Sequence, residues 1–85
     1  MLTVYTKDEC PYCDRAKKYL ENGDIEFSVI NVVEDAQALA FIKENNHRTV
    51  PQIYLDGELF VDGGCDGLMN MTHDMIKIKL EEMDL

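Results

Sequence analysis

A pair of cysteines at the start of an expected helix is the feature that most constrains how this chain can fold. The first apolar segment, Leu2–Thr6, is rich in β-branched and aromatic residues and predicts a short strand. The sequence Cys10-Pro11-Tyr12-Cys13 follows closely and predicts a helix start, because a proline at the first helical position needs no N–H donor. Both cysteines therefore belong to the first turn of a helix that follows a strand.

Hydrophobic periodicity and turn residues predict the next elements. The first helix should extend to about Asn22, where Gly23 supplies a C-terminal stop, and a strand should cover Ile25–Val33. This strand becomes mostly apolar toward its end, which is typical of a strand buried within a sheet. Asp35 can cap a second helix, which Asn45-Asn46 should end.

The last third of the sequence predicts a hairpin and a final helix. The segments Pro51–Leu55 and Leu59–Val61 flank Asp56-Gly57, and both turn residues tolerate the positive φ of a tight hairpin turn. Gly63-Gly64 then opens a turn, and Asp66 can cap one last helix. The expected apolar stripe of this helix is Leu68, Met71, Met75 and Ile78.

The order strand–helix–strand–helix–strand–strand–helix is that of an α/β fold. At 85 residues we expect one domain, residues 1–85. A strand–helix–strand unit with parallel strands crosses over right-handed, so that helices cover the sheet. Functional groups then gather at the carboxyl end of the first strand, and Cys10 belongs at that edge.

The charge balance and the first residues exclude several classes of partner. The 17 acidic and 8 basic residues give a net charge of -9, which repels nucleic acid and anionic membranes. No apolar run approaches the roughly 20 residues of a membrane span, and Met1–Tyr5 lacks the basic start of a signal peptide. We therefore expect a protein of the reducing cytoplasm, without nucleic-acid or membrane partners. A purely structural disulfide is not expected there.

The positions of the two cysteines predict different roles. Cys10 at the helix N-terminus faces unpaired N–H groups and the positive end of the helix dipole, which favour its thiolate. The amides of Tyr12 and Cys13 and the cation of Lys7 can add to this effect, so the pKa of Cys10 should lie well below that of a free thiol. Cys13 lies three residues further along the same face of the helix, within disulfide reach but shielded from solvent. This asymmetry favours an attacking thiol and a resolving thiol.

A metal site is the competing interpretation of the pair. Zinc needs four ligands, and beyond Cys10 and Cys13 the chain offers only Cys65, His47 and His73. Three cysteines cannot complete a four-cysteine iron–sulfur site within one chain. A cluster shared between two chains stays open. We expect no metal in the single chain.

Pro51 marks a second notable place in the backbone. It begins a predicted strand, where a proline leaves backbone groups of Val50 unpaired. From the residues alone we expect a trans bond at the start of an edge strand, because only about 5% of X–Pro bonds are cis. A cis Val50–Pro51 bond would instead turn the Val50 backbone outward, where an extended peptide could pair with it.

Three separated motifs together resemble the glutaredoxin family, in its small dithiol class. They are Cys10-Pro11-Tyr12-Cys13, Thr49-Val50-Pro51 and Gly63-Gly64-Cys65-Asp66. Tyr5-Thr6-Lys7 and Arg15-Ala16-Lys17, on either side of the first motif, are similar to that family as well. The resemblance implies a thioredoxin-like fold with a four-stranded mixed sheet flanked by three helices. It also implies a cis bond before Pro51 and glutathione as the reductant.

The resemblance further implies an activity and its residues. Cys10 would be the nucleophile that takes glutathione in a mixed disulfide, and Cys13 would be the resolving thiol. The protein would be a monomeric thiol–disulfide oxidoreductase with glutathione as co-substrate and no bound cofactor. It would reduce glutathione mixed disulfides and protein disulfides such as that of ribonucleotide reductase. The implied glutathione contacts are Lys7, Tyr12 and Arg48 near the glycine end, Thr49, Val50 and Pro51 along the backbone, and Gly64, Cys65 and Asp66 at the γ-glutamyl end.

The sequence departs from the family pattern in three places. Glu58–Asp62 is longer than the family usually shows, and Gly67 stands where a second acidic residue is common. Gln37 is next to the place of a further contact to the glycine carboxylate.

The alternative function is a non-catalytic carrier of an iron–sulfur cluster, bridging two chains with glutathione. Pro11 argues against the carrier, because cluster-binding relatives tend to have a more flexible residue there.

Overall fold

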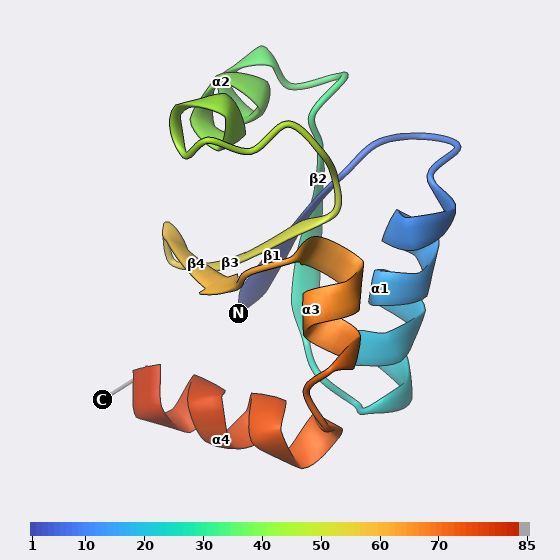
Figure 1. The fold of residues 1–85 in the computed structure, drawn as a ribbon, viewed down its shortest axis with the longest axis vertical. Helices are drawn as coiled ribbons and strands as arrows, with labels where there is room; N and C mark the ends of the chain where they lie inside the picture. Colours follow the sequence, from blue (N-terminus) through green and yellow to red (C-terminus); the bar gives the residue numbers. More distant parts are fainter. Residues whose placement is uncertain (84–85) are drawn as a thin grey trace.

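The strand β1 (Leu2–Thr6) lies inside a four-stranded mixed sheet, as Figure 1 shows in a computed structural model that describes residues 1–83. The strand order is β2-β1-β3-β4. β1 pairs in parallel with β2 (Phe27–Asn31) and antiparallel with β3 (Gln52–Leu55), which pairs antiparallel with β4 (Glu58–Val61). The predicted α/β class and the mixed sheet are therefore confirmed.

The two predicted helices of the first half are confirmed to within a residue. α1 (Pro11–Asn22) has Cys10 as its N-cap and Pro11 in its first turn. α2 (Ala36–Glu44) begins where the Asp35 carboxylate accepts the amide N–H of Ala38 at 3.0 Å. Within residues 1–83, no helix has both the length and the apolar character that a membrane crossing requires.

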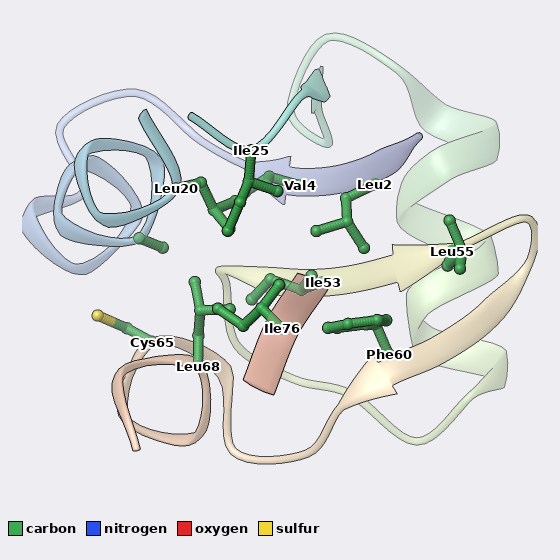
Figure 2. Close-up of a cluster of buried hydrophobic side chains, with 11 residues drawn as sticks. Leu2, Val4, Leu20, Ile25, Ile53, Leu55, Phe60, Cys65, Leu68 and Ile76 are labelled. Carbon is green, nitrogen blue, oxygen red and sulfur yellow. The ribbon is translucent and has the colours of Figure 1, made fainter. Parts of the chain in front are cut away.

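Helices cover both faces of the sheet. The larger core cluster lies between one face and the helices α1, α3 (Gly64–Met69) and α4 (His73–Met83), and Figure 2 shows its side chains converging from strands and helices. Its fully buried members include Leu2, Leu20 and Ile76. The smaller cluster, around Val32, Ala38 and Ile42, packs α2 on the opposite face. α1 and α3 lie side by side, and both begin near the end of the sheet where β1 finishes (Figure 1).

Two strand positions differ from the prediction. β2 is an edge strand in which Ser28 and Val29 are exposed, so the expectation of a strand buried within the sheet is wrong. β3 lies between β1 and β4, and all four of its residues are buried, so the expectation of an edge strand after Pro51 is also wrong. The hairpin between β3 and β4 is confirmed, with positive φ at Asp56 and Gly57.

The single final helix that we expected is two helices. α3 begins after Gly63, whose φ of 92° is left-handed, and Asp66 lies in its first turn instead of capping it. α4 starts anew because the Thr72 hydroxyl accepts the amide N–H of Met75 at 3.1 Å, as an N-capping side chain does. The apolar stripe changes accordingly. Met75 and Ile78 are about half exposed, with 49% and 55% of their surface accessible, whereas Ile76 is fully buried.

Candidate active site

Cys10 and Cys13 form a disulfide across the first turn of α1. Their Cα atoms are 5.2 Å apart, and the amide N–H of Cys13 donates to the Cys10 sulfur at 3.2 Å. Of the two amide donors that we expected, this is the one that the structure shows. Cys10 keeps 6% of its surface accessible and Cys13 none, so Cys13 is the more deeply buried residue of the pair, as predicted.

The backbone before β3 lies against the disulfide. The carbonyl oxygen of Val50 is 3.9 Å from the Cys10 Sγ, and the Val50–Pro51 peptide bond is cis. The cis bond that the family resemblance implied is confirmed, and the trans bond expected from the residues alone is wrong. The loop between α2 and β3 is therefore in direct contact with the Cys10 sulfur.

Two hollows meet beside Cys10. The first, which we call the α2-side hollow, has a volume of about 430 Å³ and contains Cys10 in its wall. The second, the α3-side hollow, has a volume of about 550 Å³ and extends from Tyr12 to the start of α3. Five residues line both hollows: Tyr12, His47, Arg48, Thr49 and Val50. A bound molecule that lies along residues 47–50 would therefore extend in both directions from Cys10.

The structure brings the predicted site residues together around these hollows. Lys7 lines the α2-side hollow, together with Cys10. Tyr12, Arg48, Thr49 and Val50 belong to the shared wall, and Pro51, Gly64, Cys65 and Asp66 line the α3-side hollow. Cys13 is buried behind Cys10.

Close packing explains one departure from the family pattern. A Cβ atom on Gly67 would overlap the carbonyl oxygen of Asp62, so the path of the segment before α3 leaves no room for a side chain at Gly67. Gly64, with a φ of 59°, is packed in a similar way, because a Cβ there would lie 2.8 Å from the carbonyl oxygen of Pro51. Glycine at both positions allows α3 to start close to the loop that lines the hollows.

Cys65 has the surroundings of a small buried residue. It keeps 4% of its surface accessible, and its sulfur lies 3.6 Å from the thioether sulfur of Met69. Burial, and to a smaller extent the Asp66 carboxylate, raise the pKa of its thiol above the usual value. At neutral pH Cys65 is therefore a neutral thiol, unlike the thiolate expected of Cys10.

Sequence reasoning missed three polar residues in the walls of the two hollows. His47 lines both hollows, Lys43 lines the α2-side hollow, and Gln52 lines the α3-side hollow. The sequence suggests His47 only as a zinc ligand, although its place directly before Arg48-Thr49-Val50 is a signal for the site. Among residues 1–83, no group of three or more His, Cys, Asp or Glu side chains has the arrangement of a metal site.

Comparison with known sequences identifies relatives of this site. The glutaredoxin family profile matches residues 2–60. Glutaredoxin 3 of Escherichia coli K12 is 39% identical over 66 residues, which cover 76% of this chain and 77% of that protein. Glutaredoxin 1 of Rickettsia typhi is 36% identical over 76 residues, which cover 86% of this chain and 71% of the relative.

Comparison with solved structures agrees with the thioredoxin-like fold. A buckwheat glutaredoxin in complex with glutathione superposes with a TM-score of 0.76 at 30% identity, over 95% of this chain and 76% of that one. The glutaredoxin-like protein NrdH-redoxin of Escherichia coli superposes with a TM-score of 0.66 at 25% identity, over 91% of both chains. From the matching profile, the relatives and the CxxC pair at the start of α1, we conclude that the chain belongs to the glutaredoxin family of thiol–disulfide oxidoreductases.

Proposed function

We propose that the protein is a glutathione-dependent oxidoreductase that reduces glutathione mixed disulfides and protein disulfides through Cys10 and Cys13. The observation that carries the proposal is the placement of the two sulfurs. Cys10 lies in the wall of a hollow, and Cys13 is fully buried directly behind it. The protein disulfide of ribonucleotide reductase is one substrate that we propose, in a reducing compartment such as the cytoplasm.

The proposed cycle begins with the reduced dithiol. The Cys10 thiolate attacks one sulfur of the substrate disulfide, forms a mixed disulfide with it and releases the other sulfur as a thiolate. Cys13 then loses its proton, attacks the Cys10 sulfur and releases the second substrate thiol. The amide N–H of Cys13 stabilises negative charge on Cys10, because it already points at that sulfur from 3.2 Å.

Two molecules of glutathione return the Cys10–Cys13 disulfide to the dithiol. The first glutathione thiolate attacks the Cys10 sulfur, which frees Cys13 and leaves glutathione bound to Cys10. The second attacks the sulfur of the bound glutathione, giving oxidised glutathione and the Cys10 thiolate. Each substrate disulfide thus consumes two glutathione thiols, and the protein ends unchanged.

The hollows suggest how glutathione binds in this cycle. We propose that its backbone pairs with Val50, beside the Cys10 sulfur, as an added strand would. Its glycine carboxylate then faces Lys7 and Arg48, which line the α2-side hollow. Its γ-glutamyl end enters the α3-side hollow, where we assign its charged groups to the segment Gly64–Asp66.

Serine substitutions at the two cysteines test the proposed cycle. Cys13→Ser should abolish reduction of a protein disulfide but retain removal of glutathione from a mixed disulfide, since the second reaction needs only the attacking thiolate. Cys10→Ser should abolish both reactions. The measurement is a glutathione-coupled assay with one substrate of each kind. Loss of both activities in the Cys13→Ser protein would show that the two thiols do not divide the work in this way.

Alanine substitutions test the proposed contacts with glutathione. Arg48→Ala and Lys7→Ala should each raise the KM for a glutathionylated peptide about fivefold, with a smaller change in kcat, because a charge contact binds ground state and transition state alike. Lys77, an exposed lysine of α4, provides the control, and Lys77→Ala should leave KM unchanged. An unchanged KM in both test variants would exclude these two cations from the glutathione site.

A further inference from the structure

Two side chains of β3 hold the loop that forms the shared wall of the hollows. The Tyr54 hydroxyl lies 2.8 Å from the Nε2 atom of His47, within hydrogen-bond distance. The Gln52 amide donates from Nε2 to the carbonyl oxygen of Thr49 at 2.9 Å. Gln52 and Tyr54 are two residues apart in the strand, so both side chains leave the same face of the sheet and meet the loop there.

Tyr54 is a fixed anchor for His47. It keeps 1% of its surface accessible, and the rings of Tyr5 and Phe41 pack against it with centroid distances of 5.5 Å and 5.1 Å. Burial raises the pKa of Tyr54, so its hydroxyl keeps its proton at neutral pH and is available for a hydrogen bond with the His47 ring. A buried hydroxyl without a hydrogen-bond partner destabilises the folded state, and the hydrogen bond with His47 gives the Tyr54 hydroxyl its partner.

His47 also fixes the loop through its backbone. Its amide N–H donates to the carbonyl oxygen of Ile42 at 2.9 Å, at the end of α2. His47 is thus tied to α2 by its main chain and to β3 by its side chain. The next three residues, 48–50, line both hollows and end at the Val50 carbonyl beside Cys10. Any shift of His47 would therefore move the wall on which a substrate lies.

We propose that His47 is a positioning residue, which acts through Tyr54 to hold residues 48–50 in the conformation that receives the glutathione part of a substrate. The inference takes glutathione as the ligand from the proposed function. It adds the hydrogen bond between His47 and Tyr54, two residues that are not among the predicted site residues. His47 itself needs no contact with glutathione. Its effect is to keep Arg48, Thr49 and Val50 in place before the substrate arrives, so that binding need not order them.

A double-mutant cycle on the hydrogen bond tests this role. Tyr54→Phe removes the hydroxyl and keeps the ring, and His47→Ala removes the imidazole. Each should raise the KM for a glutathionylated peptide about fivefold with kcat close to that of the wild type. The double variant should show no further rise, because both changes break one bond. His47→Gln, which can still bond to Tyr54, should restore most of the wild-type KM.

Tyr5→Phe is the matched control. It removes a hydroxyl from the same aromatic group, and that hydroxyl makes no hydrogen bond to residues 1–83. Its KM should equal that of the wild type. A Tyr54→Phe variant with unchanged KM would overturn the proposal. So would a further rise of KM in the double variant, since His47 would then act on the substrate directly.

Amide hydrogen exchange separates this inference from the proposed function. The His47 N–H is held by Ile42, so loss of the Tyr54 bond should speed its exchange about fivefold in Tyr54→Phe but not in Tyr5→Phe. If the wild-type protein did not use glutathione at all, the proposed function would fail, and exchange at His47 would still decide whether Tyr54 holds the loop. Equal exchange rates of the His47 amide in the wild type and in Tyr54→Phe would show that the Tyr54 hydrogen bond does not hold the loop in place.

Discussion

At the scale of single residues, three cysteines in one small protein have three different surroundings. Cys10 caps α1, accepts an amide N–H and lies in the wall of a hollow. Cys13 has no accessible surface. Cys65 is buried beside Met69, and the pKa of its thiol is raised. Because the thiolate is the reactive form, these differences predict that one cysteine reacts with external reagents well before the others.

Alkylation of the reduced protein by iodoacetamide, followed by mass spectrometry, measures that order. Cys10 should be labelled with a pH midpoint well below the value of about 8.5 for a free thiol, because its thiolate is stabilised. Cys65 should be labelled only at a pH above the usual thiol range, since a raised pKa keeps it neutral to higher pH. A midpoint near 8.5 at Cys10, or earlier labelling of Cys13, would contradict the assignment of Cys10 as the attacking thiol.

At the scale of elements, the break between α3 and α4 decides which side chains the C-terminal part of the chain buries. Thr72 starts α4 in a new direction, and Ile76 becomes the side chain that enters the main core. Leu80 and Met83 pack at its edge, while Ile78 faces away with 55% of its surface accessible. Isoleucine thus occurs in both environments within one helix.

These two isoleucines give a matched pair for a stability measurement. Ile76→Ala should lower the free energy of unfolding by about 2–5 kcal/mol, because it leaves a cavity in a fully buried site. Ile78→Ala should change it by less than about 0.5 kcal/mol. Urea unfolding of both variants provides the comparison. A larger loss for Ile78→Ala would mean that the continuous apolar stripe expected from the sequence is correct.

Elements with local signals could be predicted from the sequence, and those set by distant contacts could not. Cys10-Pro11 and Asp35 cap their helices themselves, and Asp56-Gly57 specifies its own turn. The inner position of β3 depends on pairing with β1, which no local pattern encodes. The same holds for the site. The motifs located the cysteines and the loop after Arg48, but the hydrogen bond between His47 and Tyr54 exists only once that loop lies against the sheet.

At the scale of the whole molecule, the charge near Cys10 is opposite to the overall charge. The chain carries a net charge of -9. The α2-side hollow nevertheless contains Lys7, Lys43 and Arg48, and Glu9 is the acidic residue in its lining. An anionic molecule, such as the glutathionylated peptide of the proposed function, is thus repelled by most of the surface and attracted at the hollow, which favours its approach to Cys10.

Salt should weaken this local attraction. Raising the ionic strength from about 0.05 M to about 0.5 M should raise the KM for a glutathionylated peptide about threefold, because salt screens the attraction between the cations of the hollow and the anionic peptide. The Arg48→Ala protein should respond less, since one of those cations is gone. A disulfide formed from an uncharged thiol serves as the control and should show no salt dependence. An equal response for both substrates would show that the cations of the hollow do not guide binding.

The position of Cys13 beside Cys10 makes the outcome of the proposed cycle depend on the concentration of glutathione. In the proposed cycle, two reactions can break a mixed disulfide between Cys10 and glutathione. Cys13 attacks the Cys10 sulfur within the same molecule, so the rate of this reaction does not depend on the concentration of any reactant. The rate of attack by free glutathione rises in proportion to the glutathione concentration. The two rates are equal at one concentration of glutathione, which is the effective molarity of Cys13. Below that concentration most mixed disulfides are broken by the Cys13 thiol, and above it most are broken by free glutathione.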